Sequence, residues 1–572
     1  MSAPSDNDGV ERRTVRASVR EALRRGLGEA VVVGALSPAA AALGDEIEIE
    51  RPGNPEHGDL ATNLALRLAR PLRMAPPQIG AALVAALNDL AGREPDFPID
   101  RATVAGPGFV NLVIRDTTLE RRIVAALRRP AEWGRSRTGP SPRHVNVEFV
   151  SANPTGPLTV GNARGAFVGD LLARVLEAGG QRVTREYYFN DSGTQVRNLG
   201  ASVLAVRDGE PVPEDGYHGE YVAALAAALP EDLASVAGLP EAEREGREWA
   251  VGGWASERIR AGIEASLEAL GVHFDAWTTE GSLHAEGWVD RAIERLRAGS
   301  HLYEQDGALW FRSTALGDDK DRVLIRANGQ PTYFAADVGY LVQKFSRGFD
   351  HLIFIWGADH HGTVARVRNA AEAMGYDKAA VEMILTGWVR FIRDGVEISM
   401  SKRAGTFITL DELLADLGAD AARWYFASRG ANVNMDVDIE LARRQSGENP
   451  VYYVQYAHAR IASILRKAAA SGITPAAGVE GHLAGPEEGR LARVIVRYPE
   501  VVEDAAAAQE THAITTYATE LATAFHAFYR DARVVDPSNP ARSAARLALV
   551  EAARITLANA LGLLGISAPE SM

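Results

Sequence analysis

Two hydrophobic periods alternate along the middle of the chain. Residues 144–150 alternate apolar and polar side chains, as expected of a β-strand. Residues 163–180 have apolar positions at helical spacing and end in two glycines, which predicts a helix with a glycine stop. Residues 181–191 then have the pattern of a second strand. This order predicts one βαβ unit, with a loop that crosses over the N-terminus of the helix.

A more polar segment interrupts this α/β pattern. Residues 195–300 are mostly helical in pattern, which predicts an insertion between two halves of a nucleotide-binding fold. Further along the chain, residues 391–400 predict a hairpin that turns at Asp394-Gly395. Between the insertion and the hairpin, the α/β pattern returns in three segments, at 331–345, 351–362 and 381–391.

The two ends of the chain have different patterns from the middle. Residues 58–72 have helical apolar spacing at Leu60, Leu64, Leu66 and Leu68, and residues 101–116 predict a strand, a Gly-Pro-Gly turn and a strand. From residue 411 onward the chain is almost wholly helical in pattern. We therefore predict an α/β protein of three domains: an α+β N-terminal domain at 1–115, a Rossmann-type nucleotide-binding domain with its insertion at 116–430, and an all-α domain at 431–572.

Composition narrows the class of protein. The chain has 572 residues, of which 46% are hydrophobic and 24% charged, as in soluble globular proteins with a sizeable core. No apolar stretch reaches the roughly 20 residues that cross a bilayer, and the N-terminus lacks the apolar core of a signal peptide. The absence of cysteine excludes disulfides and thiolate metal sites. We predict a cytoplasmic protein with no membrane partner.

The charged residues bear on which partners are feasible. The net charge of −14 does not exclude a nucleic-acid partner, because phosphate binding needs only a local basic stripe. All but five of the 61 basic residues are arginine, so few lysines could contact a triphosphate. Lys402 is one of them.

Two loops are candidates for binding a nucleotide. The Gly/Pro-rich loop 151–162 would direct free backbone N–H groups and a helix N-terminus towards an anion. The loop 399–403, Ser-Met-Ser-Lys-Arg, would place Lys402 where it can neutralise developing phosphate charge. Alternatively, the first is an ordinary connection and the second a solvated basic turn. Their pairing favours the nucleotide interpretation, because each follows a strand on either side of the insertion.

A strand end and a C-terminal helix carry further candidates. The segment Gly357-Ala358-Asp359-His360-His361 is predicted to face the nucleotide crevice. We predict no metal site there, because no third ligand lies at metal-site spacing. Residues 449–468 interleave tyrosines with arginines, including Tyr456 and Arg460, which suits base stacking and phosphate contact in RNA. The alternative is a core helix packed through its tyrosines.

Long segments in a consistent order make the chain resemble the arginyl-tRNA synthetases of bacteria, which are class I aminoacyl-tRNA synthetases. The resemblance implies an added N-terminal domain that contacts the tRNA elbow, a catalytic domain and a helical anticodon-binding domain. The segments that carry it are 58–70, 105–112, 148–158, 185–195, 215–222, 270–277, 321–340, 355–362, 400–413, 448–461 and 563–572.

The resemblance implies an arginine–tRNA ligase. Such an enzyme would use ATP with Mg²⁺ to activate L-arginine and would transfer the arginyl group to tRNA(Arg), as a monomer and without a covalent enzyme intermediate. Two other hypotheses stay open at this point. The protein could be a specialised or inhibitor-resistant paralogue, or a catalytically weak protein that binds tRNA or arginine.

The resemblance also assigns roles to residues. Asp337 would pair with the planar guanidinium of arginine, and Tyr333, four residues earlier, would share its helix face. Glu148, Asn153, Tyr333 and Asp337 would together bind arginine, and Tyr456 and Arg460 would bind tRNA. The residues expected around ATP are Thr159, Gly161, Asn162, Gly357, Asp359, His360, Met400, Ser401 and Lys402, of which Thr159, Asn162 and Lys402 would be catalytic.

The first signature departs from the usual His-x-Gly-His of this family. Thr159 and Asn162 replace both histidines; they can donate hydrogen bonds but cannot carry a positive charge. The loss of one such donor could cost about 10²–10³ in rate. Bacterial tryptophanyl enzymes have a similar Thr-Ile-Gly-Asn, so this form is compatible with class I chemistry. The second signature has Ser399 where lysine is usual and keeps Lys402.

Overall fold

A five-stranded parallel sheet forms the centre of the protein. The computed structural model describes residues 13–42, 47–136, 142–234, 241–393, 395–397, 409–483 and 485–572. In the sheet the strand order is β11-β10-β4-β5-β6. The order reverses at β4, which is the arrangement that places a ligand crevice at the carboxyl ends of β4 and β10. The strands are β4 (His144–Glu148), β5 (Arg182–Phe189), β6 (Ala276–Thr279), β10 (His351–Gly357) and β11 (Val381–Thr386).

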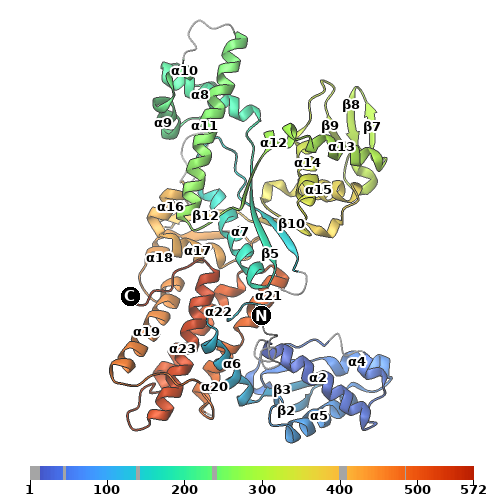
Figure 1. Ribbon diagram of the computed structural model, residues 1–572, viewed down its shortest axis with the longest axis vertical. Helices are drawn as coiled ribbons and strands as arrows, with labels where there is room; N and C mark the ends of the chain where they lie inside the picture. The colour runs from blue at the N-terminus through green and yellow to red at the C-terminus, as the bar shows by residue number, and fades with distance from the viewer. Residues whose placement is uncertain are drawn as a thin grey trace, which may run out of the picture.

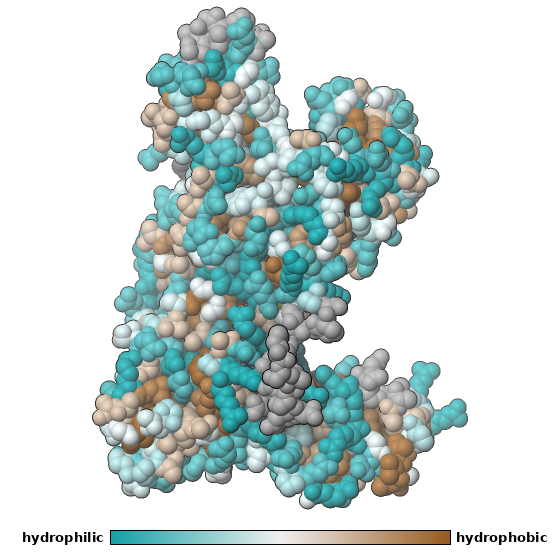
Figure 2. All heavy atoms as spheres, in the orientation of Figure 1, coloured by the Kyte–Doolittle hydropathy of each residue, from teal (hydrophilic) through white to brown (hydrophobic). Residues whose placement is uncertain are grey.

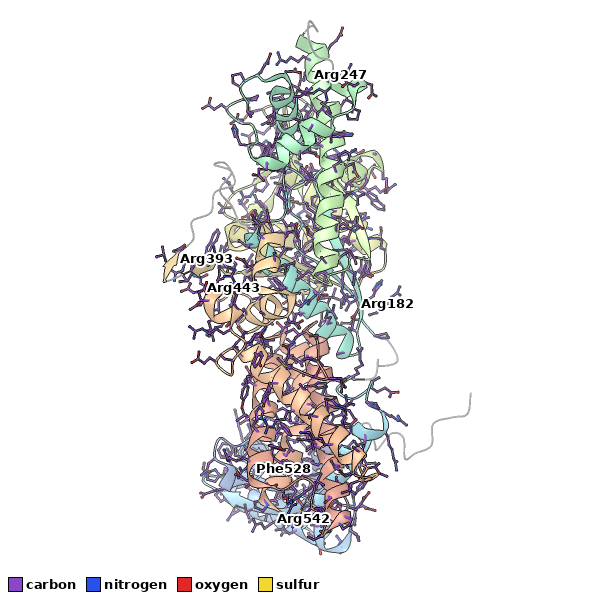
Figure 3. The ribbon with its side chains drawn as sticks, turned by 90° about the vertical axis from the view of Figure 1, so that its left-hand side faces the viewer. Arg182, Arg247, Arg393, Arg443, Phe528 and Arg542 are labelled. Carbon is purple, nitrogen blue, oxygen red and sulfur yellow. The ribbon has the colours of Figure 1, made fainter. Side chains whose placement is uncertain are left out.

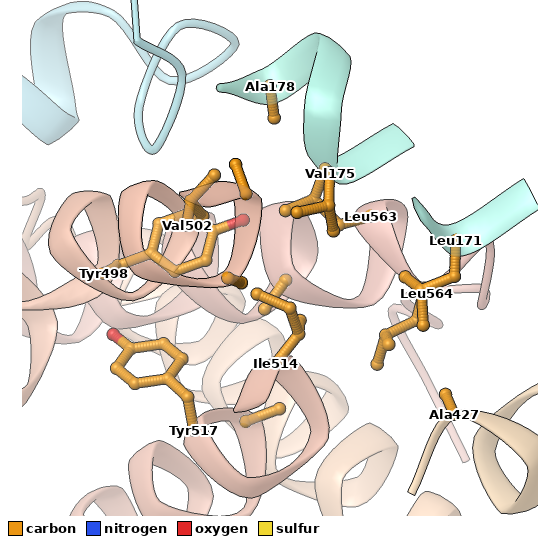
Figure 4. Packing of buried hydrophobic residues seen from close by; sticks show 14 of the residues in the cluster. Leu171, Val175, Ala178, Ala427, Tyr498, Val502, Ile514, Tyr517, Leu563 and Leu564 are labelled. Carbon is orange, nitrogen blue, oxygen red and sulfur yellow. The ribbon is translucent and has the colours of Figure 1, made fainter. Parts of the chain in front are cut away.

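Helix α7 (Val160–Ala178) connects β4 to β5 and is buried along most of its length. Gly169 brings it close to the sheet, because a Cβ there would lie 2.1 Å from the ring of Phe149. The far part of α7 packs against C-terminal helices, where Val175 lies beside Leu563 and Tyr498 (Figure 4). The predicted βαβ unit is therefore confirmed, and one core joins the sheet to the C-terminal domain.

Two lobes project from the sheet. Helices α8 to α11 form an elongated arm, and the small antiparallel sheet β7-β8-β9 with α13 to α15 forms a second lobe with its own core (Figure 1). The surface is deeply notched between them (Figure 2). Their elements are α8 (Thr194–Asp208), α9 (Glu220–Ala228), α10 (Glu231–Ala234), α11 (Glu241–Ala269), α12 (Glu280–Ala285), α13 (Trp288–Ala298), β7 (Leu302–Gln305), β8 (Ala308–Phe311), β9 (Arg322–Ile325), α14 (Tyr333–Ser346) and α15 (His361–Ala373).

One strand of the central sheet comes from within the region expected to be a helical insertion. β6 is only four residues long and pairs with β5, so the arm spans α8 to α11 and the chain then returns to the sheet. So short an edge strand leaves little periodic signal among longer helices. Its position matters for the site, because α12 begins directly after its carboxyl end.

The predicted hairpin is confirmed and lies beside a third strand. β12 (Val389–Arg393) pairs antiparallel with β13 (Val396–Glu397) and parallel with β14 (Met435–Asp438). β14 corrects the expectation of an almost wholly helical C-terminal part. Asp394 lies outside the described residues. Arg393 and Arg443 both bind the carboxylate of Asp416, at 2.7 and 2.5 Å, and lie close together in Figure 3.

The N-terminal domain packs helices on the antiparallel sheet β1-β3-β2. The predicted strand–turn–strand is confirmed as β2 and β3. Leu60 lies in strand β1, where it pairs with Leu112 of β3, and the helix begins at Leu64. The expected helical spacing from Leu60 was therefore wrong at its start. The elements are α2 (Val15–Val32), α3 (Ala39–Ala42), β1 (Leu60–Thr62), α4 (Leu64–Leu72), α5 (Pro76–Arg93), β2 (Ile99–Ala105) and β3 (Phe109–Ile114).

The C-terminal domain is helical apart from β14, and ion pairs join it to the N-terminal domain. Arg493 lies 2.6 Å from Asp59, and Arg16 lies 2.7 Å from Asp504. Across the described ranges, no helix combines the length and apolarity needed to cross a membrane. The helices of this domain are α18 (Ile439–Arg443), α19 (Pro450–Ala470), α20 (Pro486–Val496), α21 (Tyr498–Ala508), α22 (Ala513–Asp531) and α23 (Pro540–Leu563). Three helices precede it in the chain: α6 (Asp116–Arg128), which packs on α20 and α23, α16 (Leu410–Leu417) and α17 (Ala419–Ala427).

Candidate active site

The loop between β4 and α7 has an unusual backbone that neighbouring side chains hold in place. Val150 and Ser151 have φ values of 66° and 40°, a region that non-glycine residues rarely adopt. The Tyr187 hydroxyl accepts from the Ala152 N–H at 3.0 Å and donates to its carbonyl at 3.1 Å. These hydrogen bonds thus hold a strained turn in place, as is common where a backbone binds a ligand.

Thr159 and Asn162 form one hydrogen-bonded unit at the start of α7. The Thr159 hydroxyl donates to Asn162 Oδ1 at 2.9 Å, and the Thr159 N–H donates to the same oxygen at 3.2 Å. Because Oδ1 is already an acceptor, the group that Asn162 can offer a ligand is its Nδ2 donor. Gly161 is exposed in the same turn. The first turn of α7 therefore presents donors and the positive helix end to an anion.

The chain that follows the second signature loop returns to the first. Thr409 forms an antiparallel bridge with Thr159, and the Leu410 N–H donates to the Leu158 carbonyl at 2.8 Å. Met400, Ser401 and Lys402 themselves lie outside the described residues. Thr409 and Leu410, which follow that loop in the chain, therefore lie beside the start of α7.

Arg164 ties α7 to the chain segments that precede β12 and β14. It is almost fully buried, and its guanidinium donates to the carbonyls of Gly387 and Gly430, both at 3.0 Å. It also reaches the Trp388 carbonyl at 3.3 Å. Burial lowers the pKa of Arg164. The sequence analysis missed this residue, because a lone arginine on a helix gives no pattern that signals it.

The end of β10 forms the other side of the crevice. Gly357 ends the strand beside Thr386 of β11, and the ring centroids of Trp356 and His360 are 5.7 Å apart. His360 is exposed, whereas the side chain of Asp359 lies outside what the structure describes. Within the described residues, no three His, Asp or Glu side chains could hold a metal ion. Because β10 is next to β4, Gly357 and the α7 loop lie at the same sheet edge.

Asp337 on α14 lies in a cluster of side chains with Glu280, Glu148 and Tyr188, which we name the acidic pocket. Tyr188 donates its hydroxyl to Glu280 Oε2 at 3.0 Å, and Glu280 is buried at the start of α12. Burial, with the nearby charges of Glu280 and Asp337, raises the pKa of Tyr188, and burial raises that of Glu280. Burial raises the pKa of Asp337 to about 7; Arg366 opposes the shift, while Glu280 and Glu148 add to it. The pocket therefore groups acidic side chains whose charged forms burial disfavours, and a cationic group placed beside them would favour the carboxylate forms.

Glu148 forms an ion pair with a buried lysine, Lys344. Lys344 Nζ lies 3.1 Å from both Glu148 Oε2 and Glu186 Oε2, and donates to Asn146 Oδ1 at 2.5 Å. Lys344 and Glu186 are fully buried. Burial acts to raise the pKa of Glu186, but Lys344 and Arg347 outweigh it and lower the value to about 2. Burial raises the pKa of Glu148, and Lys344 opposes that shift. The cluster fixes β4, β5 and α14 relative to one another.

The other two residues predicted to bind arginine, Tyr333 and Asn153, lie at the surface. Tyr333 is 57% exposed, so it is not a core residue, and its hydroxyl would lie 3.4 Å from a Cβ at Gly193. Asp337 is one turn further along the same helix face, as predicted. Asn153 is exposed in the loop after β4. Tyr188 and Glu280, which the sequence analysis missed, complete the pocket. Tyr188 had a signal in its position near the end of the predicted strand at 181–191, whereas Glu280 had none, because β6 was not predicted.

A second cluster lies on the C-terminal domain. Arg460 lies over the rings of Tyr456 and Tyr529, at 5.7 and 4.5 Å from the centroids, and donates to the Tyr456 hydroxyl at 2.6 Å. The ring of His526 stacks 6.0 Å from that of Tyr456. Tyr456 and Tyr529 are both 37% exposed. The cluster therefore offers stacked aromatic faces and a cation at the surface, as the pattern of α19 predicts.

Three protein-family models match the chain. Residues 15–114 match the N-terminal domain of arginyl-tRNA synthetases, and residues 129–211 match the catalytic domain of class I (R) tRNA synthetases. Residues 454–572 match the DALR anticodon-binding domain.

Curated relatives match almost the whole chain. An arginine–tRNA ligase of Bacillus subtilis is 44% identical over 535 residues, which cover 92% of this chain and 94% of the relative. An arginine–tRNA ligase of Bacillus velezensis is 43% identical and covers 93% of this chain and 96% of the relative. The Thermus thermophilus arginyl-tRNA synthetase structure, 24% identical, superposes with a TM-score of 0.73 over 97% of this chain and 100% of its own, which shows the same fold.

Proposed function

Because the chain belongs to the arginyl-tRNA synthetase family, we propose that it is an arginine–tRNA ligase. The reaction condenses L-arginine with ATP to arginyl-adenylate and pyrophosphate, and then transfers the arginyl group to the terminal ribose of tRNA(Arg). The class I family uses ATP, and Mg²⁺ would accompany its phosphates. Positioning and charge stabilisation would account for the rate, with no covalent enzyme intermediate.

The acidic pocket at Asp337 is the observation that carries this proposal. A guanidinium has five donors in one plane and stays cationic at every physiological pH. Asp337 would accept two of these donors, while Glu280 and Tyr188 contribute acceptors and negative charge nearby. Tyr333 would close over the side chain from the exposed rim. Asn153 and Glu148 would bind the α-amino end.

ATP would lie at the carboxyl ends of β4 and β10. Its phosphates would meet the first turn of α7, where Thr159, Gly161 and Asn162 present donors without a charge. Gly357, Asp359 and His360 would contact the nucleoside on the neighbouring strand end. Lys402, with Met400 and Ser401, would supply the positive charge that the missing histidines cannot. Thr159, Asn162 and Lys402 are thus the proposed catalytic residues.

tRNA would bind along the helical side of the molecule. Tyr456 and Arg460 would stack on and pair with anticodon nucleotides, because the exposed aromatic faces and the arginine lie together on α19. We propose that the protein acts as a monomer in the cytoplasm, where its tRNA substrate is charged.

Arginine affinity is expected to depend on the protonation of Asp337. Its pKa is about 7 in the ligand-free protein, so the carboxylate is charged above that pH and neutral below it, whereas the guanidinium keeps its charge throughout. The dissociation constant for arginine should therefore rise as the pH falls, approaching about tenfold per pH unit below 7. Calorimetric titration at pH 8, 7 and 6 measures this. A constant affinity over that range would contradict the assignment.

Arginine-dependent exchange of labelled pyrophosphate into ATP tests the proposed reaction. In this family activation generally needs bound tRNA, so we expect exchange when tRNA(Arg) is added and little without it. Lysine replaces arginine in the matched control, because it has the same charge but not the planar fork. Exchange that is equal with lysine, or absent with arginine and tRNA, would overturn the proposal.

A further inference from the structure

A cavity of about 540 Å³ lies where the N-terminal domain meets α6, the helix that packs on the C-terminal domain (Figure 1). Ligand sites in proteins have volumes of roughly 300–1,000 Å³. Its walls come from α2 and the chain just before it, from the chain around the start of β2, from α6, and from Glu480 of the C-terminal domain. Among the described residues, none that is proposed above to bind ATP, arginine or tRNA lines this cavity.

Arginine dominates the polar lining of this cavity. The lining has five arginines from two parts of the chain, Arg13, Arg25, Arg121, Arg122 and Arg128. Three carboxylates also line it, those of Glu21, Asp96 and Glu480, so the arginines exceed the carboxylates by two. The chain as a whole has the opposite balance, with a net charge of −14. A hollow that gathers cations on an acidic protein attracts anions to that place.

Arg122 is the buried arginine of this group, and hydrogen bonds fix the walls around it. It is 6% exposed, and its guanidinium donates to the Ser18 hydroxyl of α2 at 3.2 Å. On the same helix, Glu120 Oε1 accepts from the Gly481 N–H at 2.7 Å, which holds the loop that carries Glu480 against α6. The cavity is thus shaped before any ligand binds, which reduces the entropy that binding would cost.

Two of the exposed arginines form ion pairs that leave donors for a ligand. Arg25 donates to Glu94 at 2.5 Å, and Arg121 donates to Asp96 at 3.1 Å. The side chains of Glu94 and Asp96 are 40% and 90% exposed, so water screens both pairs and they add little to stability. A guanidinium has five N–H donors, so each arginine can keep its carboxylate and still bind a second anion.

Phosphate is the anion that this arrangement suits best. A guanidinium binds two phosphate oxygens through parallel N–H donors, and arginines on both α2 and α6 can bind more than one phosphate group. Ala22, Pro98 and Val124 add an apolar part to the lining, and the volume exceeds what one phosphate group fills. We propose that this cavity binds a small molecule with two or more linked phosphate groups, at a site separate from that of the ATP substrate.

Calorimetric titration of the full-length protein with inorganic tripolyphosphate tests this inference. The Arg25→Gln/Arg121→Gln double variant removes two exposed cations from the cavity and keeps Arg122, and its dissociation constant should be at least about tenfold higher. The Arg67→Gln/Arg93→Gln control removes two exposed, ion-paired arginines of the N-terminal domain outside the cavity, and should bind as the wild-type protein does. Arg122→Lys keeps the charge without the planar fork, and should weaken binding several-fold. Binding at the nucleotide site is common to all these proteins, so their difference reports on the cavity.

Two further ligands identify where the phosphate groups come from. Titration with GTP measures whether a nucleotide binds better than the bare phosphate chain; a site for either one that the cavity double variant loses supports the inference. The KM for ATP and the dissociation constant of tRNA(Arg) should be the same in the cavity double variant and the wild-type protein.

These titrations need no catalysis, so they decide the role of the cavity separately from the proposed function. Equal affinities of the wild-type protein and the cavity double variant for both tripolyphosphate and GTP would overturn the inference. So would a loss of tRNA(Arg) affinity that matches the loss of tripolyphosphate binding, because the arginines would then contact the RNA backbone and not a separate small molecule.

Discussion

Replacement of Asp337 by asparagine should lower kcat/KM for arginine by roughly 10²- to 10³-fold, the cost of removing one member of a buried charge pair. Asparagine keeps the size of the side chain but loses the charge that the guanidinium would meet. Glu280 and Tyr188 remain, so the pocket keeps its shape and part of its acidity. The KM for ATP should be about the same as in the wild-type protein, because Asp337 lies on α14 and not among the donors at the start of α7. Steady-state exchange kinetics with arginine and ATP varied separately measure both values.

Two comparisons make this result specific. Asp290→Asn removes an exposed carboxylate from the neighbouring helix α13 and should leave both constants unchanged. The Asp337→Asn protein should also lose the pH dependence of arginine binding between pH 8 and 6. A small effect on arginine, or an equal effect on arginine and ATP, would show that Asp337 does not bind the guanidinium.

Replacement of Lys344 by methionine should destabilise the protein by roughly 3–5 kcal/mol, the typical cost of leaving a buried charge without its partner. Lys344 is fully buried and is the cation that contacts Glu148, while Glu186 keeps Arg347 at 2.7 Å. Methionine fills a similar volume, so the loss comes from charge rather than from a cavity. The midpoint of urea unfolding at an unchanged slope measures the effect.

Lys467→Met provides the control for this variant. Lys467 is exposed on α19, so its replacement should change stability by no more than about 0.5 kcal/mol. If the Lys344 variant unfolds at the same urea concentration as the Lys467 variant, the cluster does not hold β4, β5 and α14 together as described.

The elements that carry strong periodicity or turn chemistry could be predicted from the sequence. The βαβ unit, helix α14 and the β12–β13 hairpin each have a long pattern or a glycine stop, and the structure confirms them. β6 and β14 could not be predicted, because four residues at a sheet edge make too little pattern to outweigh the helices around them. Leu60 was placed in a helix because its spacing to Leu64 fits one turn, but pairing with Leu112 determines its conformation.

The site residues also divide into those that could be predicted from the sequence and those that could not. Asp337 and Tyr333 could be paired from their spacing on one helix, and the α7 loop from its glycines and prolines. Glu280 and Lys344 could not be found, because their role depends on which strands become neighbours: β5 beside β6 brings Glu280 to Tyr188, and β4 beside β5 brings Lys344 between two carboxylates. Lys344 gave only a compositional signal, as one of five lysines in the chain. Long-range contacts of this kind leave no local pattern.

The most direct test is the attachment of labelled arginine to tRNA(Arg) by the purified protein in the presence of ATP and Mg²⁺. Our account predicts that arginine becomes bound to the RNA with multiple turnovers per enzyme molecule, because Thr159 and Asn162 still provide donors at the start of α7 and the acidic pocket at Asp337 is intact. Tight binding of tRNA(Arg) with no charging, even at high enzyme concentration, would contradict it. That result would mean that the protein has kept the binding surfaces of a synthetase and lost its chemistry.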